Sequence, residues 1–454
     1  MLISFSVTNF RSFGEEVTLT MVASNKLVDH ENHCVPIGDT GKSVLRASVI
    51  YGANAAGKSN LVRAIAFAQQ LIREPGDRRY TMPFRFSDNN ENNPSSFEFR
   101  FLVDGRVFIY GFDIVGCTVL SEWLSVLKGD ADIQLYERDK SGAVQVFPAV
   151  LEQFPDDATT YETLKVLRQI PVRTEQLFLS RASSTPESAQ GKVLKSIIKW
   201  FSSTLLVLPA NSRSPGILDR LHADPVFRDF CSGFLRSIGT GIGSLELIFR
   251  EREPQPWEKS FLERYPKQRR MMPAFFEIDT DIIPNPENPG LIIERKLLSE
   301  HRIGPGSYSL PFSEESDGTQ AILHLMPILA SPPDDPLVVV MDELDRSLHP
   351  LICWSFIKFF SESCSGAHRQ LIVTTHEAHL LNQELLRRDE YWFAEKDSKQ
   401  QTQLVSLDKF KIRNDLKVER GYLQGRFGAI PMIGGVQELE RLLSCEEAPD
   451  AEKV

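Results

Sequence analysis

The segment from Leu337 to Pro350 reads LVVVMDELDRSLHP and indicates the fold more clearly than any other part of the chain. Its residues 338–341 form a continuous apolar run, which is typical of a parallel strand buried on both faces. Two adjacent carboxylates, Asp342 and Glu343, follow at the predicted carboxyl end of this strand. Ligands of open α/β sheets bind just outside such strand ends. The two carboxylates therefore suit a magnesium ion and an attacking water, provided that a phosphate-binding loop lies elsewhere in the chain.

A phosphate-binding loop is present upstream. Residues 47–51 (ASVIY) form a short apolar run, residues 52–60 read GANAAGKSN, and the helical pattern LVRAIAFAQQLI follows. This is the pattern G-x-x-x-x-G-K-[ST] between a predicted strand and a predicted helix, the context that the motif requires. Gly52 and Gly57 let the backbone curve so that its N–H groups face phosphate oxygens, and the helix N-terminus adds partial positive charge.

The polar residues of this loop have distinct expected roles. Lys58 can reach the β- and γ-phosphates, while Ser59 and Asp342 can ligate magnesium. The predicted nucleotide-binding residues of the loop are Gly52, Asn54, Gly57, Lys58, Ser59 and Asn60. The alternative is a glycine-rich turn that binds nothing, and the strand and helix that flank the motif disfavour it.

Length and composition indicate an ordinary globular protein. The chain has 454 residues, of which 42% are apolar and 25% charged, which suits one large domain or two to three units. Its formal net charge of -10 argues against non-specific coating of DNA, although a local basic patch can still act. No apolar run approaches the length of a membrane span, and the N-terminal MLISFSVTNFRSF lacks the features of a signal peptide. The six cysteines form no C-x-x-C pair, so we expect no disulfide framework and a cytoplasmic location.

Three further motifs surround the carboxylate strand. Residues 315–320 read ESDGTQ ahead of a predicted helix, where Ser316 and Gly318 would form a second phosphate-binding surface, although S-x-G alone is more often a turn. Asp345 follows the carboxylate pair in the segment LDRSLHP. His376 follows the predicted strand QLIVT of residues 370–374, and its plain alternative is a helix N-terminal residue.

The order of these motifs resembles that of the ABC-type ATPase heads of the RecF, SMC, Rad50 and OLD group. In that comparison ESDGT resembles the signature loop, LDRSLHP the D-loop and TTH the switch histidine. Residues 9–13 (NFRSF) resemble the opening of these heads, in which the arginine approaches the nucleotide phosphates or ribose. The resemblance implies this role for Arg11, and a surface charge is the alternative. Residues 425–431 (GRFGAIP) are similar to a segment of head-only ATPases from anti-phage operons, the RloA/AbiLi-like and PARIS AriA-like proteins.

The resemblance implies a reaction at a site shared by two heads. Lys58, Ser59 and Asp342 of one head would hold the phosphates of ATP and Mg²⁺, and Ser316 and Gly318 of the other would complete the site. Glu343 would orient or deprotonate the attacking water, His376 would contact the γ-phosphate, and Asp345 would couple the two sites. The expected catalytic residues are thus Glu343, His376 and Lys58, and the expected cofactors are ATP and Mg²⁺. The superfamily's Q-loop glutamine has no match near Pro83–Phe84.

The resemblance also implies an architecture. We expect an α/β fold with a mixed central sheet, an antiparallel β subdomain, a helical lobe and no long coiled coil. Residues 1–22 alternate like an edge hairpin, and residues 80–127 predict further antiparallel strands with a turn at Asp104–Gly105. The predicted units are an N-terminal ATPase lobe (1–130), a mixed, mainly helical lobe (131–310), a C-terminal ATPase lobe (311–444) and a frayed tail (445–454).

Two functions remain open at this point. The 78 residues after His376 are too few for an appended Toprim nuclease, so the first hypothesis is a sensor and scaffold in anti-phage defence. It would form a homodimer or higher homo-oligomer and control a separately encoded effector, for which a Toprim-type nuclease is a candidate, in response to DNA or a phage-derived trigger. The second hypothesis is a RecF-like repair ATPase that binds DNA directly through Arg78–Arg79, residues 267–270 or Arg387–Arg388, clusters that are more often plain surface. The cluster HENHC at residues 30–34 is more often a polar loop than a metal site.

Overall fold

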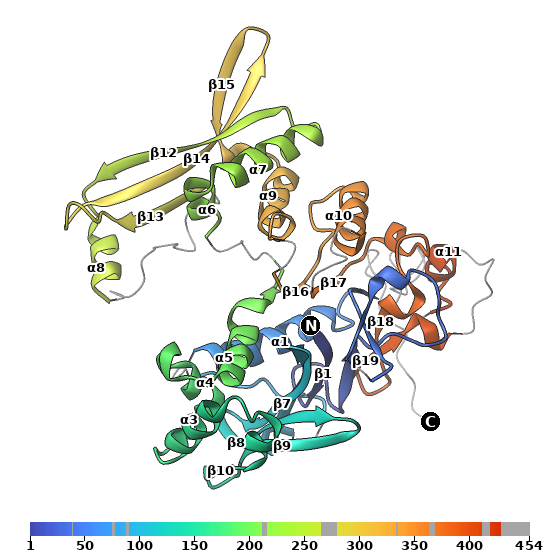
Figure 1. Ribbon diagram of the computed structural model, residues 1–454. Coiled ribbons are helices and arrows are strands. Elements are labelled where there is room, and N and C mark those ends of the chain that lie inside the picture. The colour runs from blue at the N-terminus through green and yellow to red at the C-terminus, as the bar shows by residue number, and fades with distance from the viewer. Residues whose placement is uncertain are drawn as a thin grey trace, which may run out of the picture.

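The computed structural model describes residues 1–38, 40–74, 78–87, 90–210, 216–264, 279–332, 335–362, 368–410 and 418–427. Three larger β-sheets organise these residues, together with the two-stranded pair β3 (Cys34–Pro36) and β4 (Ser43–Leu45). Figure 1 shows the sheets and the helices packed around them. No helix among these residues is long and apolar enough to cross a membrane.

The central sheet is mixed and has the order β11-β16-β17-β5-β18-β19. Its strands are β5 (Ala47–Gly52), β11 (Leu205–Leu208), β16 (Leu337–Met341), β17 (Arg369–Thr374), β18 (Tyr391–Lys396) and β19 (Thr402–Ser406). Neighbouring strands run parallel except for the antiparallel pair β18 and β19. Strands β5 and β17 are buried along their whole length, as continuous apolar runs require. The mixed sheet and the buried strand predicted over residues 338–341 are confirmed.

Three helices connect to this sheet where the sequence predicts them. Helix α1 (Lys58–Arg73) follows β5 directly, α9 (Asp317–Leu329) precedes β16, and α10 (Pro350–Glu362) joins β16 to β17. Because β5, β16 and β17 are parallel, their carboxyl ends meet at one edge of the sheet. The phosphate-binding loop and the carboxylate pair are therefore brought to the same edge.

The second sheet is antiparallel and has seven strands in the order β10-β9-β8-β7-β6-β1-β2. They are β1 (Leu2–Thr8), β2 (Val17–Thr20), β6 (Ser95–Val103), β7 (Arg106–Val115), β8 (Thr118–Lys128), β9 (Ala131–Arg138) and β10 (Val144–Val146). The predicted edge hairpin of residues 1–22 is confirmed, as is the turn at Asp104–Gly105, whose two residues both have positive φ. Strand β9 pairs with β8, so the boundary predicted at residue 130 falls inside a hairpin.

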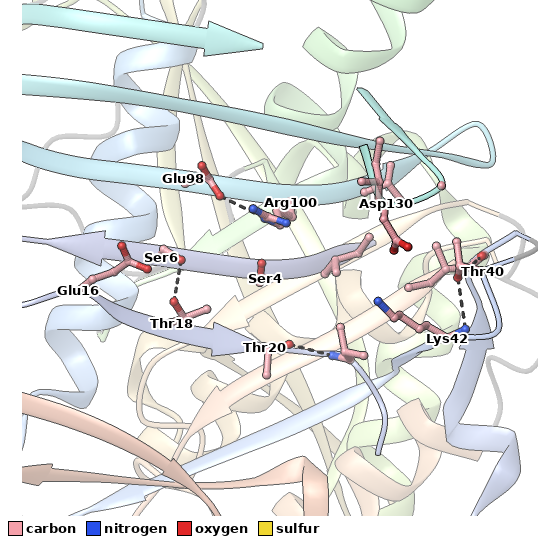
Figure 2. Close-up of a pocket in the computed structure, with 16 residues that line it drawn as sticks. Ser4, Ser6, Glu16, Thr18, Thr20, Thr40, Lys42, Glu98, Arg100 and Asp130 are labelled. Carbon is pink, nitrogen blue, oxygen red and sulfur yellow. Dashed lines mark hydrogen bonds and ion pairs between the residues drawn. The ribbon is translucent and has the colours of Figure 1, made fainter. Parts of the chain in front are cut away.

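The outer face of this antiparallel sheet is polar. A groove of about 550 Å³ lies on it, and the residues that line it include Ser4 and Ser6 of β1, Thr18 and Thr20 of β2, and Glu98 and Arg100 of β6 (Figure 2). Ser6 and Thr18 share a hydrogen bond of 2.8 Å between their hydroxyls, and Arg100 pairs with Glu98 at 3.2 Å. This alternation leaves the apolar side chains of the same strands for the inner face.

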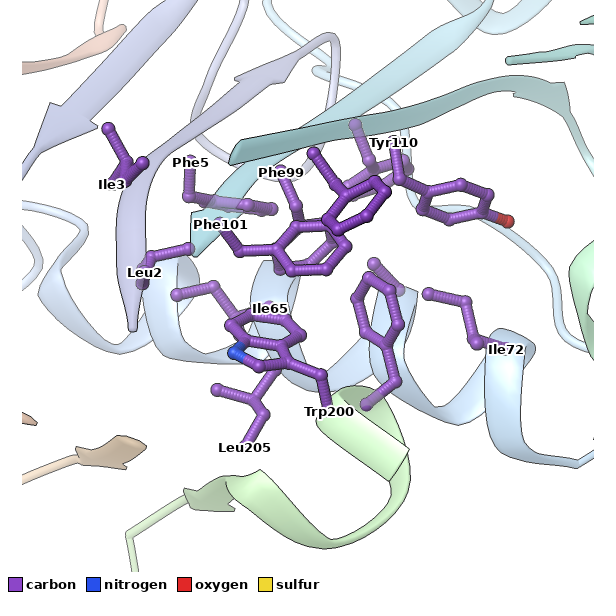
Figure 3. Close-up of a cluster of buried hydrophobic side chains, with 14 of the residues drawn as sticks. Leu2, Ile3, Phe5, Ile65, Ile72, Phe99, Phe101, Tyr110, Trp200 and Leu205 are labelled. Carbon is purple, nitrogen blue, oxygen red and sulfur yellow. The ribbon is translucent and has the colours of Figure 1, made fainter. Parts of the chain in front are cut away.

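The inner face of the antiparallel sheet packs on helix α1 through aromatic rings. Figure 3 shows this cluster, in which Phe99 and Phe101 of β6 meet Trp200 and the helix residue Ile65. The rings of Phe101 and Trp200 are stacked with centroids 4.4 Å apart. Burial of such rings contributes on the order of 2–3 kcal/mol each, so the helix that follows the phosphate-binding loop is firmly held.

A small helical lobe follows the antiparallel sheet and ends in a π-helix, Trp200–Thr204. Its helices are α2 (Ala149–Gln153), α3 (Ala158–Arg168), α4 (Phe178–Ser183) and α5 (Lys192–Lys199). The buried carboxylate of Glu122 on β8 accepts hydrogen bonds from the Phe178 and Leu179 N–H groups at the start of α4. It also accepts hydrogen bonds from the hydroxyls of Tyr110 and Tyr136, which joins the helical lobe to the antiparallel sheet.

The rest of the middle segment differs from the mainly helical expectation. Alongside α6 (Ile217–Ala223), α7 (Pro225–Ser237) and α8 (Pro256–Arg264) it contains a third sheet of four antiparallel strands, β12 (Ile242–Arg252), β13 (Thr280–Pro284), β14 (Ile292–Ile303) and β15 (Gly306–Pro311). Strands β12 and β14 pair along their length across a wide sequence separation, which local patterns do not reveal. The longest helix in the described ranges is α1, with 16 residues, too short for a coiled-coil arm.

The remaining helices are short. One is α11 (Val418–Leu423), and the others are single 3-10 turns at Glu31–His33, Asn90–Asn92, Glu187–Ala189, Phe312–Glu314, Ala378–Leu380, Arg388–Glu390 and Leu407–Lys409. The predicted tail, residues 445–454, and residues 428–431 of the GRFGAIP segment lie outside the described residues. Phe427 of that segment stacks on Phe393 of β18, with centroids 5.5 Å apart.

Candidate functional site

The phosphate-binding loop has the geometry that its glycines predict. Gly57 has a φ of 109°, and a Cβ there would lie 2.0 Å from the Thr402 hydroxyl. A Cβ on Gly52 would lie 2.6 Å from the Ala394 carbonyl oxygen. Both positions therefore require glycine for steric reasons, and Gly57 also for its backbone conformation. Asn54, at the tip of the loop, is exposed.

Lys58 is the buried cation of this loop. Its side-chain Nζ donates to the carbonyl oxygens of Gly52, at 2.7 Å, and Ala53, at 3.3 Å. Burial lowers the pKa of Lys58 to about 8, and the carboxylates of Asp342, Asp345 and Glu343 act in the opposite direction. Lys58 is 6% exposed, and its ammonium group is bonded to loop carbonyls alone among the described residues, so it suits a phosphate ligand.

This lowered pKa predicts a pH dependence for ATP affinity. Lys58 is charged below about pH 8 in the free protein, and above that pH it must take up a proton when an anionic ligand binds. The affinity is expected to be flat below pH 8 and to fall up to about tenfold per pH unit above it. Calorimetric titrations at pH 7, 8 and 9 measure this fall, and a Lys58→Arg variant, which stays charged, should lack it. An equally flat wild-type profile would contradict the prediction.

The two carboxylates at the end of β16 occupy different environments. Asp342 is buried, and its Oδ1 accepts a hydrogen bond of 2.6 Å from the Thr374 hydroxyl. That hydroxyl in turn accepts the Glu343 N–H at 2.8 Å. Glu343 has a φ of 55°, a strained value for a residue with a side chain, and its carboxylate is partly exposed, 3.5 Å from Arg346. The structure thus fixes one carboxylate and leaves the other accessible.

Thr374 was not predicted as a site residue. It ends β17, the strand that lies between β5 and β16, and its single hydroxyl contacts both members of the carboxylate pair. The only sequence signal is its place directly before Thr375 and His376 at the end of a buried strand. From the neighbouring strand, Thr374 therefore orients the carboxylate of Asp342 and the backbone of Glu343.

Removal of the Thr374 hydroxyl tests this orienting role. Thr374→Val keeps the shape of the side chain but leaves Asp342 and the Glu343 N–H without their partner. We expect a loss of about 1–3 kcal/mol in the free energy of unfolding and a higher Mg²⁺ concentration for half-maximal ATPase activity. Thr375→Val is the matched control, because the Thr375 hydroxyl accepts the N–H of Glu377 instead. Equal Mg²⁺ requirements in the two variants would count against the role.

His376 and Asp345 meet at the same edge. The His376 N–H donates to Asp345 Oδ2 at 3.1 Å, while Asp345 Oδ1 is buried without a hydrogen-bond partner among the described residues. Burial, and then the charge of Lys58, lower the pKa of His376, so its ring is neutral at pH 7. His376 lies directly before Glu377, the N-cap of the 3-10 helix Ala378–Leu380.

Ser316 and Gly318 lie at the start of α9. The Ser316 hydroxyl caps this helix by accepting the Thr319 N–H at 3.2 Å. A Cβ on Gly318 would lie 2.7 Å from the Ser347 carbonyl oxygen, so this helix start packs against the segment that follows the carboxylate pair. In the described part of the chain, no hydrogen bond or ion pair joins either residue to residues 52–60.

The N-terminal turn contacts the phosphate-binding loop through a neighbour of Arg11. The Ser12 hydroxyl accepts a hydrogen bond of 2.9 Å from Asn60 Nδ2 and shares one of 2.8 Å with the Thr402 hydroxyl. The proton of Thr402 goes to the Ala56 carbonyl oxygen, which can only accept. Neither hydroxyl was predicted as a site residue: within NFRSF only Arg11 was given a role, and Thr402 belongs to no motif. Arg11 has a φ of 52°, and its backbone N–H donates to the Met82 carbonyl oxygen at 2.6 Å.

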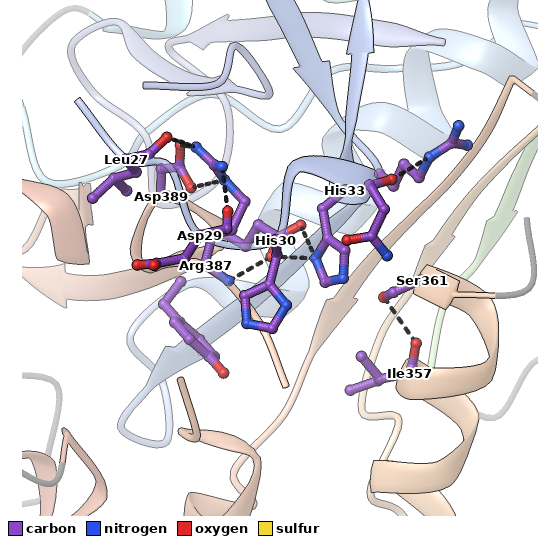
Figure 4. A network of polar contacts seen from close by, with 12 residues as sticks. Leu27, Asp29, His30, His33, Ile357, Ser361, Arg387 and Asp389 are labelled. Carbon is purple, nitrogen blue, oxygen red and sulfur yellow. Dashed lines mark hydrogen bonds and ion pairs between the residues drawn. The ribbon is translucent and has the colours of Figure 1, made fainter. Parts of the chain in front are cut away.

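The basic cluster Arg387–Arg388, one of the predicted DNA contacts, contains a buried arginine. Arg387 is buried, where it pairs with Asp389 at 2.9 Å and donates to the carbonyl oxygens of Leu27 and Asp29 (Figure 4). Such a side chain is unavailable to a DNA backbone, which leaves only the half-buried Arg388 of this predicted cluster. The nearby His33 Nδ1 lies 3.0 Å from the buried Glu390 carboxylate. Arg78 is exposed and pairs with Glu175, and residues 267–270 lie outside the described ranges.

This chain is similar to one described protein family and to several solved structures. A model of the family described as "AAA domain, putative AbiEii toxin, Type IV TA system" matches residues 47–189 and 220–382. A search of the curated proteins finds no match. Among solved structures, the SMC head domain from Thermotoga maritima is 13% identical, with a TM-score of 0.37 over 90% of this chain and 99% of that one.

Two further solved structures are similar at the same level. An SMC head bound to the C-winged helix domain of ScpA is 15% identical, with a TM-score of 0.40 over 89% of this chain and 97% of that one. The Smc head domain with an extended coiled coil, bound to the C-terminal domain of ScpA from Pyrococcus furiosus, is 12% identical, with a TM-score of 0.39 over 94% and 98%. The family model covers well over half of the chain, and the chain therefore belongs to this AAA-domain family.

Proposed function

We propose that this protein binds and hydrolyses ATP at the edge where β5, β16 and β17 end. One observation carries the proposal: the buried ammonium of Lys58 lies within electrostatic range of the carboxylates of Asp342, Glu343 and Asp345. A phosphate cradle beside two differently placed carboxylates is the minimum that metal-assisted phosphoryl transfer requires. The orphaned buried oxygen of Asp345 also suits a site that is completed by a ligand or partner.

The roles follow from the environments of the residues. The backbone N–H groups of residues 53–58 and the Lys58 ammonium would hold the phosphates, and Ser59 and Asp342 would hold Mg²⁺, which supplies charge neutralisation when bound. The accessible carboxylate of Glu343 would orient the attacking water and accept its proton. The neutral ring of His376 would donate an N–H to the γ-phosphate without adding charge.

We further propose that two copies of the chain share each site. Ser316 and Gly318 form the start of a 13-residue helix whose N-terminal partial charge suits phosphate, yet no hydrogen bond or ion pair among the described residues joins them to the P-loop of their own chain. In a symmetric pair of heads, the α9 start of one copy would face the P-loop of the other. The contact between Gly318 and the Ser347 carbonyl would then link the signature loop of each head to its own D-loop.

Mixing two inactive variants tests this sharing. Lys58→Ala removes the phosphate ligand, and Ser316→Arg blocks the start of α9, so each variant alone should be inactive. A mixed dimer pairs one intact loop with one intact α9 start, so an equal mixture should recover about a quarter of the wild-type ATPase rate at random pairing. If the mixture recovers no activity, Lys58 and Ser316 act in a site within one chain. The exposed Ser355→Arg, on α10, is a control that should leave the activity unchanged.

The broader role that we propose is a cytoplasmic sensor and scaffold in anti-phage defence that controls a separately encoded effector. The family description supports a defence setting. Direct DNA binding in the manner of a repair ATPase is the second candidate, and the burial of Arg387 weakens it. Co-purification with the product of the neighbouring gene would support the first role. Binding of naked duplex DNA that weakens steeply with salt would support the second.

A further inference from the structure

Strand β15 of the third sheet leads directly into helix α9, whose start is the phosphate-binding surface proposed above (Figure 1). The strand ends at Pro311 and the helix begins at Asp317, so residues 312–316 alone connect them. Phe312, at the start of this connection, is fully buried, whereas Ser316, at its end, is exposed. The position of Ser316 therefore depends on the contacts that hold the residues before it.

The third sheet holds the side chain of Glu315. Its Oε1 accepts a hydrogen bond of 2.5 Å from the Ser299 hydroxyl and lies 2.7 Å from Nε2 of His301. Ser299 and His301 are two positions apart on β14, so both side chains lie on the same face of the sheet. The side chains of Glu315 and His301 are only 11% and 19% exposed. A carboxylate that is largely removed from water and held at one oxygen by two side chains has a fixed orientation.

Two further side chains hold the backbone of the same connection. The fully buried carboxylate of Asp279 accepts the N–H of Ser313 at 3.1 Å and its hydroxyl at 2.9 Å. Asp279 is itself tied to β14, because its carbonyl oxygen accepts the Leu297 N–H at 2.8 Å. From the first turn of α9, the Gln320 amide donates to the carbonyl oxygens of Ser313 and Glu315. The connection is thus bound on one side to the third sheet and on the other to α9.

Glu315 differs from the other members of this network in its place directly before Ser316. Ser316 is the N-cap of α9, so the orientation of Glu315 passes through one peptide bond to the start of the helix. A displacement of about 1 Å at a group that must meet a reacting phosphate can lower the rate about 100-fold. The carboxylate of Glu315 is engaged by β14, so it would affect a phosphate through Ser316 and not by direct contact.

We propose that Glu315, held by Ser299 and His301, is a positioning residue that places the start of α9 for ATP hydrolysis in the partner head. The third sheet is then the support of the signature loop, in addition to its place in the fold. This proposal rests on the ATPase function and on the sharing of sites between two heads that are proposed above. A contribution to the stability of the fold alone is the competing explanation, and the experiment must separate the two.

Steady-state ATP hydrolysis by the full-length Glu315→Ala variant tests the proposal. We expect kcat to fall about 10- to 100-fold, while the affinity for a fluorescent ATP analogue stays within about twofold of wild type, because the phosphate-binding loop of the same chain is unchanged. Glu315→Gln should recover most of the lost rate, since its amide oxygen can accept the same two hydrogen bonds. Glu314→Ala is the matched control, because Glu314 is the adjacent glutamate and is exposed.

Mixing Glu315→Ala with Lys58→Ala separates positioning from stability. In a mixed dimer, the intact phosphate-binding loop of the Glu315→Ala chain meets the intact α9 start of the Lys58→Ala chain, so an equal mixture should recover about a quarter of the wild-type rate. A chain whose fold has failed cannot supply an intact loop, and its mixture would stay inactive. Ser299→Ala removes one of the two bonds to Glu315 and should lower kcat about fivefold at unchanged affinity for the ATP analogue, which provides a second test if Glu315→Ala protein does not fold.

The outcomes distinguish this inference from the functions on which it rests. A lower kcat that the mixture restores would support the positioning role. A wild-type kcat in Glu315→Ala, or a mixture that stays inactive while the mixture of Ser316→Arg with Lys58→Ala recovers, would overturn it. If neither mixture recovers, the sharing of sites is refuted and this inference with it. Wild-type protein without ATPase activity would refute the proposed function itself.

Discussion

Lys58→Ala protein is expected to bind ATP at least a hundredfold more weakly than wild-type protein and to show no measurable ATPase activity. The ammonium is the only cation that the structure places among the loop carbonyls of residues 52 and 53, and charge-assisted hydrogen bonds to phosphate in such a dry site are worth about 3 kcal/mol or more. Equilibrium binding of a fluorescent ATP analogue and phosphate release measure the two effects.

The fold should survive this change. Burial lowers the pKa of Lys58 to about 8, which means that the folded state disfavours its charge. A group whose pKa is lower in the folded state than in the unfolded state costs stability at every pH below that lower value. Alanine removes this cost along with two hydrogen bonds, so the midpoint of thermal unfolding should change little. Lys192→Ala, on the exposed side of α5, is the control for binding, and full ATP affinity in Lys58→Ala would refute the assignment of the P-loop.

Local sequence patterns predict the parts of this site that depend on local structure. The run of residues 338–341 is apolar because both faces of β16 are covered, and the loop of residues 52–60 is rich in glycine because its backbone leaves no space for side chains. Both features can be seen without any knowledge of their neighbours. The parallel order of the strands then brings the loop and the carboxylates to one edge, as the resemblance implied.

The parts that sequence did not predict depend on distant partners. Thr374 contacts Asp342 across two strands, 32 positions apart, and Thr402 contacts Ser12 across 390 positions. Neither hydroxyl differs locally from any other threonine in a strand. The four-stranded sheet was missed for the same reason, because β12 and β14 pair over a long separation without a hairpin turn. The cluster that contains Arg387 was predicted to lie on the surface, because composition does not reveal burial.

Glu343→Gln is expected to bind ATP as tightly as wild-type protein and to hydrolyse it about 10² to 10⁴ times more slowly, the usual contribution of a general base. Glutamine keeps the size and hydrogen bonding of the side chain but cannot accept the proton of the attacking water. Single-turnover phosphate release measures the rate, and native mass measurement with ATP should find a persistent dimer, because hydrolysis no longer ends the nucleotide-bound state.

The local environment of Glu343 explains why Glu343→Gln should slow ATP hydrolysis without changing the fold. Its backbone φ of 55° is set by the chain and by the bond from its N–H to Thr374, neither of which depends on the side-chain charge. Among the described residues, the one ion pair lost is the partly exposed one with Arg346, at 3.5 Å, which is worth about 0–1 kcal/mol. Arg346→Ala removes that pair alone and should hydrolyse ATP at close to the wild-type rate. A wild-type rate in Glu343→Gln would show that another group, for which His376 is the main alternative, activates the water.

Asp342→Asn should give a different result from Glu343→Gln. Because Asp342 is buried and bonded to Thr374, its replacement by asparagine should impair Mg²⁺ binding. Glu343→Gln should therefore lose turnover while ATP stays bound, whereas Asp342→Asn should lose the metal-dependent binding of ATP itself.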